Sequence, residues 1–146
     1  GEIGHINVNG KYPCVCGKSG CLEAASSTLA ISKAYEAQSG KSGTTTEEIY
    51  KLVVDGDSVA TQVWADATAA MARACETLIT LLAPEVIVFG GGLSNAGETF
   101  LKPIRDYLDA SLTFQRKPRL EIAHYGSKAG TIGCAMLAFD LVKAGK

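Results

Sequence analysis

Three of the five cysteines fall within eight residues of one another, in a glycine-rich loop that follows a histidine. Cys14, Cys16 and Cys21 form a C-x-C-x4-C pattern, and His5 lies nine residues before Cys14. Zn²⁺ prefers four tetrahedral sulfur and nitrogen ligands, and a structural zinc site uses all four positions. The pattern therefore predicts a structural zinc site made by His5, Cys14, Cys16 and Cys21. Glycines at positions 10, 17 and 20 would let the loop fold around the ion.

Two other interpretations of the cysteines are weaker. A secreted disulfide framework is disfavoured because we find no signal peptide, and because Cys75 and Cys134 occur singly in apolar helical patterns. Those two are expected to be small core residues. Chance placement of three free cysteines is the remaining alternative. Clustered cysteines without a signal peptide are typical of metal ligands, so we expect a cytoplasmic protein.

Composition excludes several classes of function. The 146 residues carry a formal net charge of −1, with 47% hydrophobic and 20% charged residues, which is ordinary for one globular domain. A nearly neutral chain has no electrostatic footprint for nucleic acid or for an anionic membrane surface. Its apolar runs are also too short for a transmembrane helix. We therefore expect neither a membrane nor a nucleic acid as a partner of this domain.

Two carboxylates flank the cysteine cluster. Glu2 lies three residues before His5, and Glu23 lies two residues after Cys21. Folding the loop around a metal would bring both carboxylates toward the imidazole. Such a group suits the recognition of several hydroxyls, because each charge-assisted hydrogen bond contributes roughly 1.5–3 kcal/mol. The alternatives are a helix-dipole role for Glu23 and a solvated surface position for Glu2.

The hydrophobic pattern alternates helices with strands, which predicts an α/β domain. We expect a short strand over residues 3–8 and helices over 22–38, 47–54 (capped by Thr46) and 58–82 (capped by Asp57). A strand over 86–89, a helix over 98–110, a strand over 120–123 and a helix over 128–142 complete the order. Pro103 would kink its helix or lie in the first turn. The continuous apolar run over 86–89 indicates a strand buried in a parallel or mixed sheet.

Gly90, Gly91 and Gly92 directly follow that strand. Glycines at such a position allow positive φ and a close approach of the backbone to a ligand. A tight exit from the strand explains them equally well, so three glycines alone are a weak signal.

Two segments together resemble the ROK family of repressors, open reading frames and kinases. Gly1-Glu2-Ile3-Gly4-His5, followed by the run Cys14-Val15-Cys16-Gly17-Lys18-Ser19-Gly20-Cys21-Leu22-Glu23, is similar to the family's E-x-G-H and C-x-C-G-x-x-G-C-x-E signature. The stretches over 84–94 and 129–135 are also similar to family sequences, so the resemblance covers nearly the whole chain. It implies a ribonuclease H-like domain of the actin-like ATPase class. It also implies that Glu2, His5 and Glu23 bind sugar hydroxyls, and that Gly90, Gly91 and Gly92 contact the adenosine part of ATP.

Family kinases also carry an Asp-x-Gly-Gly-Thr phosphate loop, an Asn-Asp pair that supplies the catalytic base, and a Gly-Thr-Gly motif. None occurs here. We therefore expect residues 1–146 to be the C-terminal domain of a ROK protein without its N-terminal domain, and to contain no catalytic residue. The expected function is the sugar- and ATP-binding half of a hexose kinase that uses Mg²⁺. A sugar-sensing domain of a ROK transcriptional regulator is the alternative, and the family implies a homo-oligomer in either case.

Overall fold

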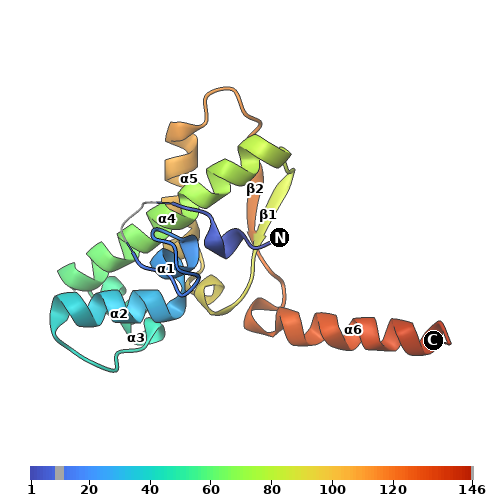
Figure 1. Ribbon diagram of the computed structural model, residues 1–146, viewed down its shortest axis with the longest axis horizontal. Coiled ribbons are helices and arrows are strands. Elements are labelled where there is room, and N and C mark those ends of the chain that lie inside the picture. Colours follow the sequence, from blue (N-terminus) through green and yellow to red (C-terminus); the bar gives the residue numbers. More distant parts are fainter. Residues whose placement is uncertain (9–11, 146) are drawn as a thin grey trace.

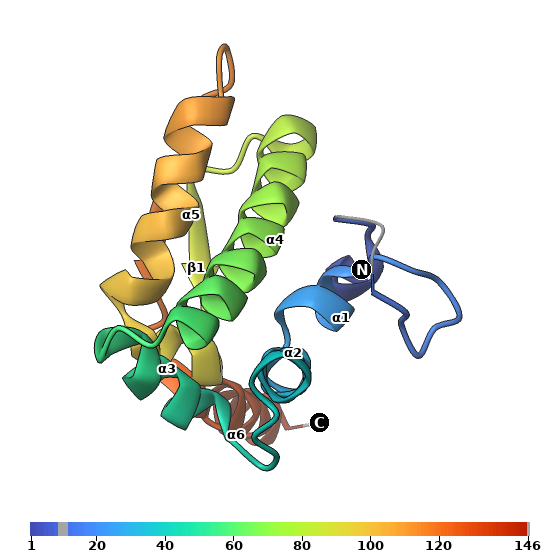
Figure 2. The same ribbon diagram turned by 90° about the vertical axis from the view of Figure 1, so that its left-hand side faces the viewer.

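The computed structural model describes residues 1–8 and 12–145, and its longest helix lies at the centre of the molecule (Figures 1 and 2). This helix, α4 (Ser58–Leu82), contacts helices on both sides. Helix α5 (Glu98–Ser111) packs along one side, whereas α1 (Leu22–Ser26) and α2 (Thr28–Ser39) pack on the other, as Figure 2 shows. Helix α3 (Thr46–Val54) packs against α2 and α4.

Two parallel strands confirm the expected α/β class. Strand β1 (Val86–Phe89) pairs with β2 (Arg119–Ile122), from Val86 opposite Arg119 to Phe89 opposite Ile122. Phe89 and Ile122 face the helices and belong to the core of α4 and α5. Val88, however, is 56% exposed. The prediction of a buried strand therefore holds for one face of β1 and is wrong for the other, because no described residues cover that face.

Small side chains on α4 allow the N-terminal loop to pack closely. Val8 and Leu22 are buried against Ala70 and Ala74 in one apolar cluster. The Arg73 guanidinium adds a hydrogen bond to the carbonyl of Val8. The cysteine-bearing loop is thus anchored on the central helix through the residues that immediately precede and follow it.

Side-chain caps explain where three helices begin, and two of them correct a prediction. The expected helix over 22–38 is divided in two, because Ser27 has extended backbone angles (φ −73°, ψ 159°) and its hydroxyl accepts a hydrogen bond from the Ala30 N–H. Asp57 caps α4 as predicted. Thr45, rather than Thr46, caps α3, where it forms a capping box with Glu48.

Pro103 lies inside α5 rather than in its first turn. Proline has no N–H, so the carbonyl four residues earlier loses its helical partner. That carbonyl belongs to Thr99, and the indole N–H of Trp64 donates to it at 3.1 Å. The buried Trp64 therefore compensates for Pro103 while it packs α4 against α5.

The first residues do not form the predicted strand over 3–8. Ile3–His5 form the 3₁₀ turn η1, closed by a hydrogen bond from the Ile6 N–H to the Ile3 carbonyl. Asn7 makes a single antiparallel bridge to Cys21. One bridge cannot continue as a ladder because Cys21 leads directly into α1.

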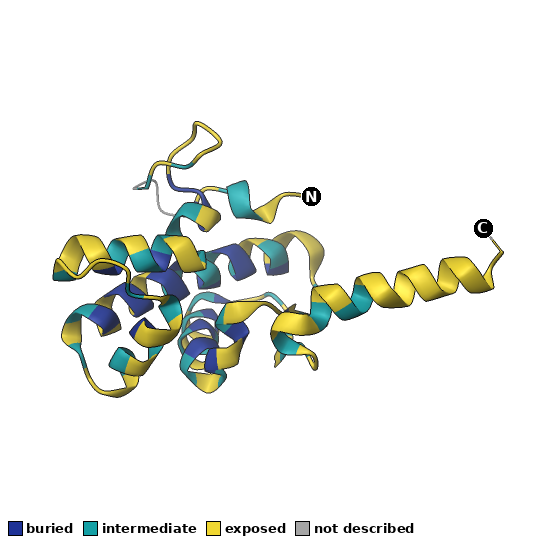
Figure 3. Cartoon of the chain, turned by 90° about the horizontal axis from the view of Figure 1, so that it is seen from below, coloured by how far each residue is buried: buried dark blue, intermediate teal, exposed yellow. Residues whose placement is uncertain are grey.

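The last helix, α6 (Ala129–Lys143), extends away from the rest of the molecule (Figures 1 and 3). All fifteen of its residues are described, and none is buried. Cys134 is therefore exposed, against the expectation of a core position, whereas Cys75 is buried as predicted. Within the described ranges, no helix is both long enough and apolar enough to cross a membrane.

Candidate metal centre and ligand-binding site

The four predicted metal ligands come together in the structure. One donor atom each from His5, Cys14, Cys16 and Cys21 lies within 4.8 Å of the others. The Cys14 N–H donates to the Lys18 carbonyl at 2.8 Å, and the Gly17 N–H donates to the Cys14 carbonyl at 3.0 Å. Gly17 has φ +84°, which a glycine adopts without strain. This tight turn directs the cysteine side chains toward one point; Gly10 lies outside the described residues.

The spacing of the donors fits one tetrahedral metal ion. Bonds of about 2.3 Å to sulfur and about 2.0 Å to nitrogen place neighbouring ligand atoms about 3.5–3.8 Å apart. The Cys14 Sγ lies 3.6 Å from the His5 Nδ1. The Cys16 Sγ lies 3.6 Å from the Cys21 Sγ. Three sulfurs and one nitrogen fill all four positions, so this arrangement suits a structural ion and leaves no open position for a reacting group.

The thiols differ in their environments. The backbone N–H of Lys18 donates a hydrogen bond to Cys16 and lowers the pKa of this exposed thiol to about 7. Cys21 is only 1% exposed, and burial, together with the neighbouring thiols, raises its pKa to about 11. A metal ion would therefore displace a proton from Cys21 at neutral pH.

His5 connects the cluster to a carboxylate. Its Nδ1 faces Cys14, whereas its Nε2 lies 3.7 Å from the Glu23 Oε2. A metal bound at Nδ1 would leave the proton on Nε2, so the outward side of the ring is a donor beside an acceptor. The two groups together can hold neighbouring hydroxyls of one ligand.

Gly4 keeps the space beside this carboxylate open. A Cβ at this position would lie 3.5 Å from the Glu23 Cβ and 3.6 Å from its Oε2, which is ordinary van der Waals distance. An alanine would thus cover the carboxylate without straining the backbone. Gly4 is part of the E-x-G-H motif, but the motif alone does not indicate that this residue leaves room beside the Glu23 carboxylate.

The other predicted carboxylate is placed differently. Glu2 precedes the 3₁₀ turn, and its backbone carbonyl accepts a hydrogen bond from the His5 N–H. Its side chain is exposed and makes no ion pair or hydrogen bond to another residue of the described ranges. The structure therefore brings the side chains of Glu23 and His5 together, whereas no ion pair or hydrogen bond within the described ranges joins the Glu2 carboxylate to either of them.

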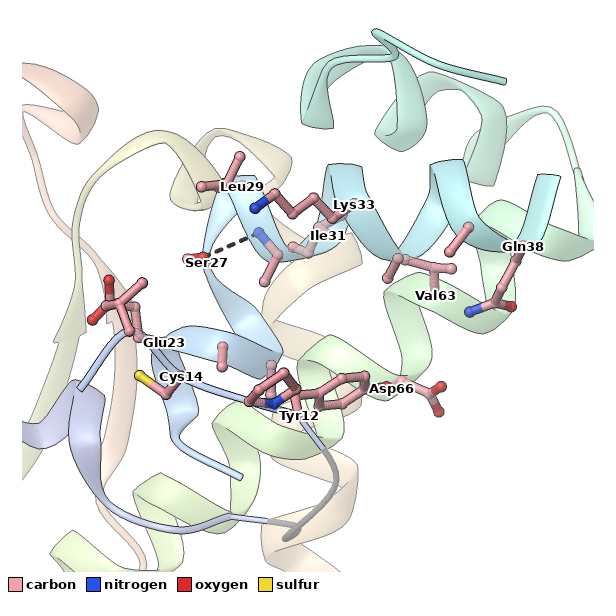
Figure 4. Close-up of a pocket in the computed structure, with 17 residues that line it drawn as sticks. Tyr12, Cys14, Glu23, Ser27, Leu29, Ile31, Lys33, Gln38, Val63 and Asp66 are labelled. Carbon is pink, nitrogen blue, oxygen red and sulfur yellow. Dashed lines mark hydrogen bonds between the residues drawn. The ribbon is translucent and has the colours of Figure 1, made fainter. Parts of the chain in front are cut away.

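A hollow of about 380 Å³ opens between the metal loop and helices α1, α2 and α4 (Figure 4). Cys14 and Glu23 lie at one end, and Leu29, Ile31 and Val63 line it further along. Apolar side chains make up most of this lining, but Lys33, Gln38 and Asp66 also line the hollow. In Figure 4 the Glu23 carboxylate points away from Gln38 and Asp66, and its Oε2 lies 3.7 Å from the His5 Nε2.

The glycine turn lies at a second hollow, of about 720 Å³. Gly92 lines it, but Gly90 and Gly91 do not. Gly91 has φ +86°, and the Ser94 hydroxyl donates to the Gly91 carbonyl at 2.7 Å, so these residues shape the turn. The other lining residues come from α2, α3 and α4 and from the turn itself: Thr28, Leu29, Ser32, Thr45, Thr46, Glu47, Tyr50, Lys51, Trp64, Leu93, Asn95 and Ala96. The lining residues from α2, α3 and α4 lie far from the glycines in sequence, which explains why the motif alone did not identify them.

The two regions meet where α1 gives way to α2. A Cβ at Gly92 would lie 3.9 Å from the Thr28 Cγ2, and Thr28 follows the Ser27 cap of α2. Glu23 lies one helical turn earlier, in α1. The short segment from Glu23 to Thr28 therefore connects the metal cluster to the wall of the second hollow.

Comparisons with known proteins agree on one family. The ROK family profile matches residues 1–140. The chain is 38% identical to a glucokinase from Halalkalibacterium halodurans, over 91% of this chain and 46% of the relative. It is 33% identical to an N-acetylmannosamine kinase from Escherichia fergusonii, over 94% of this chain and 46% of the relative. The chain thus spans about half the length of these curated relatives.

Solved structures show the same fold. A ROK family glucokinase from Streptomyces griseus, in complex with glucose and AMPPNP, superposes with a TM-score of 0.81 at 26% identity, covering 93% of this chain and 50% of that one. A ROK family transcriptional regulator, homologous to the Escherichia coli MLC protein, superposes with a TM-score of 0.70 at 27% identity, covering 84% of this chain and 34% of that one. These neighbours are sugar kinases and a regulator that share one α/β fold.

Proposed function

The chain belongs to the ROK family, and we propose that it is the C-terminal half of an ATP-dependent hexose kinase, in which it binds the sugar and the nucleotide. The observation that carries the proposal is the pairing of the His5 Nε2 with the Glu23 Oε2 at 3.7 Å beside the metal cluster. Glucokinase and N-acetylmannosamine kinase relatives support a hexose or an N-acyl hexosamine as the substrate.

The metal in this proposal is zinc. Three thiolates and an imidazole are the ligands of many structural zinc sites, and the spacing of the donors supports that assignment. When bound, zinc would hold the loop rigid and fix the orientation of the His5 ring. His5 would then donate from Nε2 to one sugar hydroxyl, and Glu23 would accept from the neighbouring one. The exposed carboxylate of Glu2, which precedes the 3₁₀ turn, would accept a hydrogen bond from a further sugar hydroxyl.

The hollow at the glycine turn is the proposed site for ATP. Gly92 lies at its wall, and the half-buried Tyr50 also lines it, which supports contact of an aromatic ring with the adenine base. The complex of the Streptomyces griseus glucokinase with AMPPNP also supports nucleotide binding by this fold. Mg²⁺ would neutralise the phosphates in the full-length protein.

Phosphoryl transfer needs a base that accepts the proton of the attacking hydroxyl. We assign no residue of this chain to that role. Glu23 and His5 are proposed to bind sugar hydroxyls, and the four metal ligands would all be bound to the ion. The proposed base lies in the other half of the polypeptide. The chain would then position both substrates but would not catalyse phosphoryl transfer by itself. We propose that the full-length protein works in the cytoplasm.

A regulator is the second candidate, and the likeness to the transcriptional regulator supports it. A regulator would use the same sugar-binding group as a sensor and would not turn over ATP. The residues described so far serve both functions equally. ATP turnover by the full-length protein therefore separates the two candidates.

The test is a kinetic comparison of the full-length protein with its Glu23→Gln variant, using glucose and N-acetylmannosamine as substrates. We expect ATP-dependent phosphorylation of one of these sugars, and a sugar KM that rises about 10- to 100-fold in the variant, because a charged acceptor is lost. The KM for ATP should stay the same. Glu36→Gln, on the exposed surface of α2, is the matched control and should change neither constant.

Equal loss of sugar and nucleotide binding in the variant would contradict the assignment of Glu23. Sugar binding without any ATP turnover would favour the regulator instead.

A further inference from the structure

The donor atoms of the metal cluster form two close pairs. The Cys14 Sγ lies 3.6 Å from the His5 Nδ1, and the Cys16 Sγ lies 3.6 Å from the Cys21 Sγ. Two sulfurs at this separation suit neighbouring ligands of one ion. A movement of about 1.5 Å would instead bring them to the length of a disulfide bond. Cys14 is the alternative partner, because its sulfur lies within 4.8 Å of both, but it faces the imidazole.

The two paired cysteines differ in their access to solvent. Cys16 is exposed, whereas Cys21 is only 1% exposed. A small oxidant can therefore reach Cys16 first, while Cys21 lies beside it inside the molecule. An accessible thiol next to a second, resolving thiol is the arrangement that redox-sensitive cysteines use.

The loop allows one sulfur of the pair to move while the other stays in place. Cys21 leads directly into α1, and the Leu22 N–H that follows it donates to the Ile6 carbonyl at 3.0 Å. Cys16 lies in the open turn beside Val15, which is 95% exposed. Closing the gap between the sulfurs therefore requires a shift of the turn and leaves the packed side of the loop unchanged.

We propose that Cys16 and Cys21 are an oxidative modification site, at which hydrogen peroxide joins the two sulfurs in the metal-free protein. The Cys16 thiol is first oxidised to a sulfenic acid, and the peroxide releases one water. The Cys21 sulfur then attacks the Cys16 sulfur, and a second water leaves as the S–S bond forms. Two thiols are thus oxidised to one disulfide, and one peroxide is reduced to two waters.

Metal binding and this disulfide exclude each other, because both use the same two sulfurs. A bound ion would protect the thiols, whereas the disulfide would leave only His5 and Cys14 as donors. Transient disulfides of this kind are the ones found in reducing compartments. The proposal concerns sulfurs that a kinase and a regulator would share, so its failure would leave the proposed function untouched.

Peptide mapping of the full-length protein tests which sulfurs are joined. The metal is removed with a chelator, hydrogen peroxide is added, the remaining thiols are alkylated and the protein is cleaved with trypsin. Lys18 lies between the two cysteines, so trypsin separates Cys16 from Cys21 unless a disulfide holds the two peptides together. We expect linked peptides from most chains, and about tenfold fewer from protein loaded with zinc. Equal amounts from both, or no linked peptides at all, would overturn the proposal.

Variants distinguish Cys16 from Cys14, which lies on the same tryptic peptide. The linked peptides should persist in Cys14→Ser and disappear in Cys16→Ser, and the reverse pattern would contradict the assignment. Cys134→Ser is the matched control, because Cys134 is also exposed but lies on α6, and it should change nothing. Should Cys14→Ser fail to fold, fragment spectra of the linked peptides from the unaltered protein assign the sulfur.

Zinc uptake is the second measurement. The oxidised protein should take up less than about a tenth of the zinc that the reduced protein binds, because two of the four ligands are lost. Treatment with a phosphine reductant should restore the uptake. Oxidised protein that binds zinc as fully as reduced protein would contradict the proposal.

Discussion

Among the individual residues, His5 is placed so that its two ring nitrogens have different partners. Nδ1 faces the sulfur of Cys14, and Nε2 faces the carboxylate of Glu23. A structural metal can therefore influence ligand binding without touching the ligand, since it fixes the tautomer and the angle of the ring. The spacing of the cysteines predicted this cluster correctly, because four residues that must reach one ion leave the loop few alternatives.

The same four residues predict how metal binding depends on pH. In the metal-free protein at neutral pH, Cys21 holds its proton because its pKa is raised to about 11, whereas Cys16, whose pKa is lowered to about 7, is protonated about half of the time and almost fully at pH 6. Binding must displace these protons, so the apparent affinity should fall as pH falls, by about tenfold per pH unit per proton displaced. The slope should steepen below about pH 7, where Cys16 also competes.

Competition with a chromophoric chelator, from about pH 8 to about pH 6, measures this slope in the full-length protein. Cys75→Ala is the control, because Cys75 is buried away from the cluster and should not change the slope. An affinity that does not vary with pH would contradict thiolate coordination.

Single residues decided the element boundaries that the sequence left ambiguous. The helical pattern continues through residues 22–38, yet the Ser27 hydroxyl caps Ala30 and divides the helix. Periodicity does not reveal such a break, because the apolar stripe continues across it. Three consecutive threonines also offered alternative caps for α3, and only the reciprocal bond between Glu48 and Thr45 selects one. The sequence left open whether Pro103 lies inside its helix or in the first turn, and the Trp64 hydrogen bond that makes the interior position tolerable comes from a residue far away in sequence.

The glycine turn carries a prediction about stability at the scale of elements. Gly91 has φ +86° and ψ −173°, a region that is nearly exclusive to glycine. Gly91→Ala should therefore lower the free energy of unfolding of the full-length protein by roughly 1–3 kcal/mol. Gly92→Ala is the matched neighbour: a Cβ there meets only the Thr28 Cγ2, at an ordinary 3.9 Å, so the cost should stay below about 0.5 kcal/mol.

Urea unfolding of the two variants measures both values. A tolerated alanine at position 91 would show that the turn between β1 and α5 is not held in this conformation in the full-length protein.

In the molecule as a whole, the order of elements from residue 46 onward was predictable, whereas burial was predicted only in part. Alternating helices and apolar strands indicated an α/β domain, and β1 and β2 are indeed parallel. The exposure of Val88 and Cys134 was not foreseen, because an apolar pattern shows that a residue requires burial but not which element covers it.

We have proposed that the metal centre shapes a sugar site in this half of the protein. Calorimetry of the full-length protein before and after removal of the metal would measure its affinity for glucose and for N-acetylmannosamine, with AMPPNP binding measured in parallel. We expect removal to weaken binding of the preferred sugar at least about tenfold, because His5 would lose its fixed orientation, while the affinity for the nucleotide persists. Unchanged sugar affinity in the metal-free protein would contradict it.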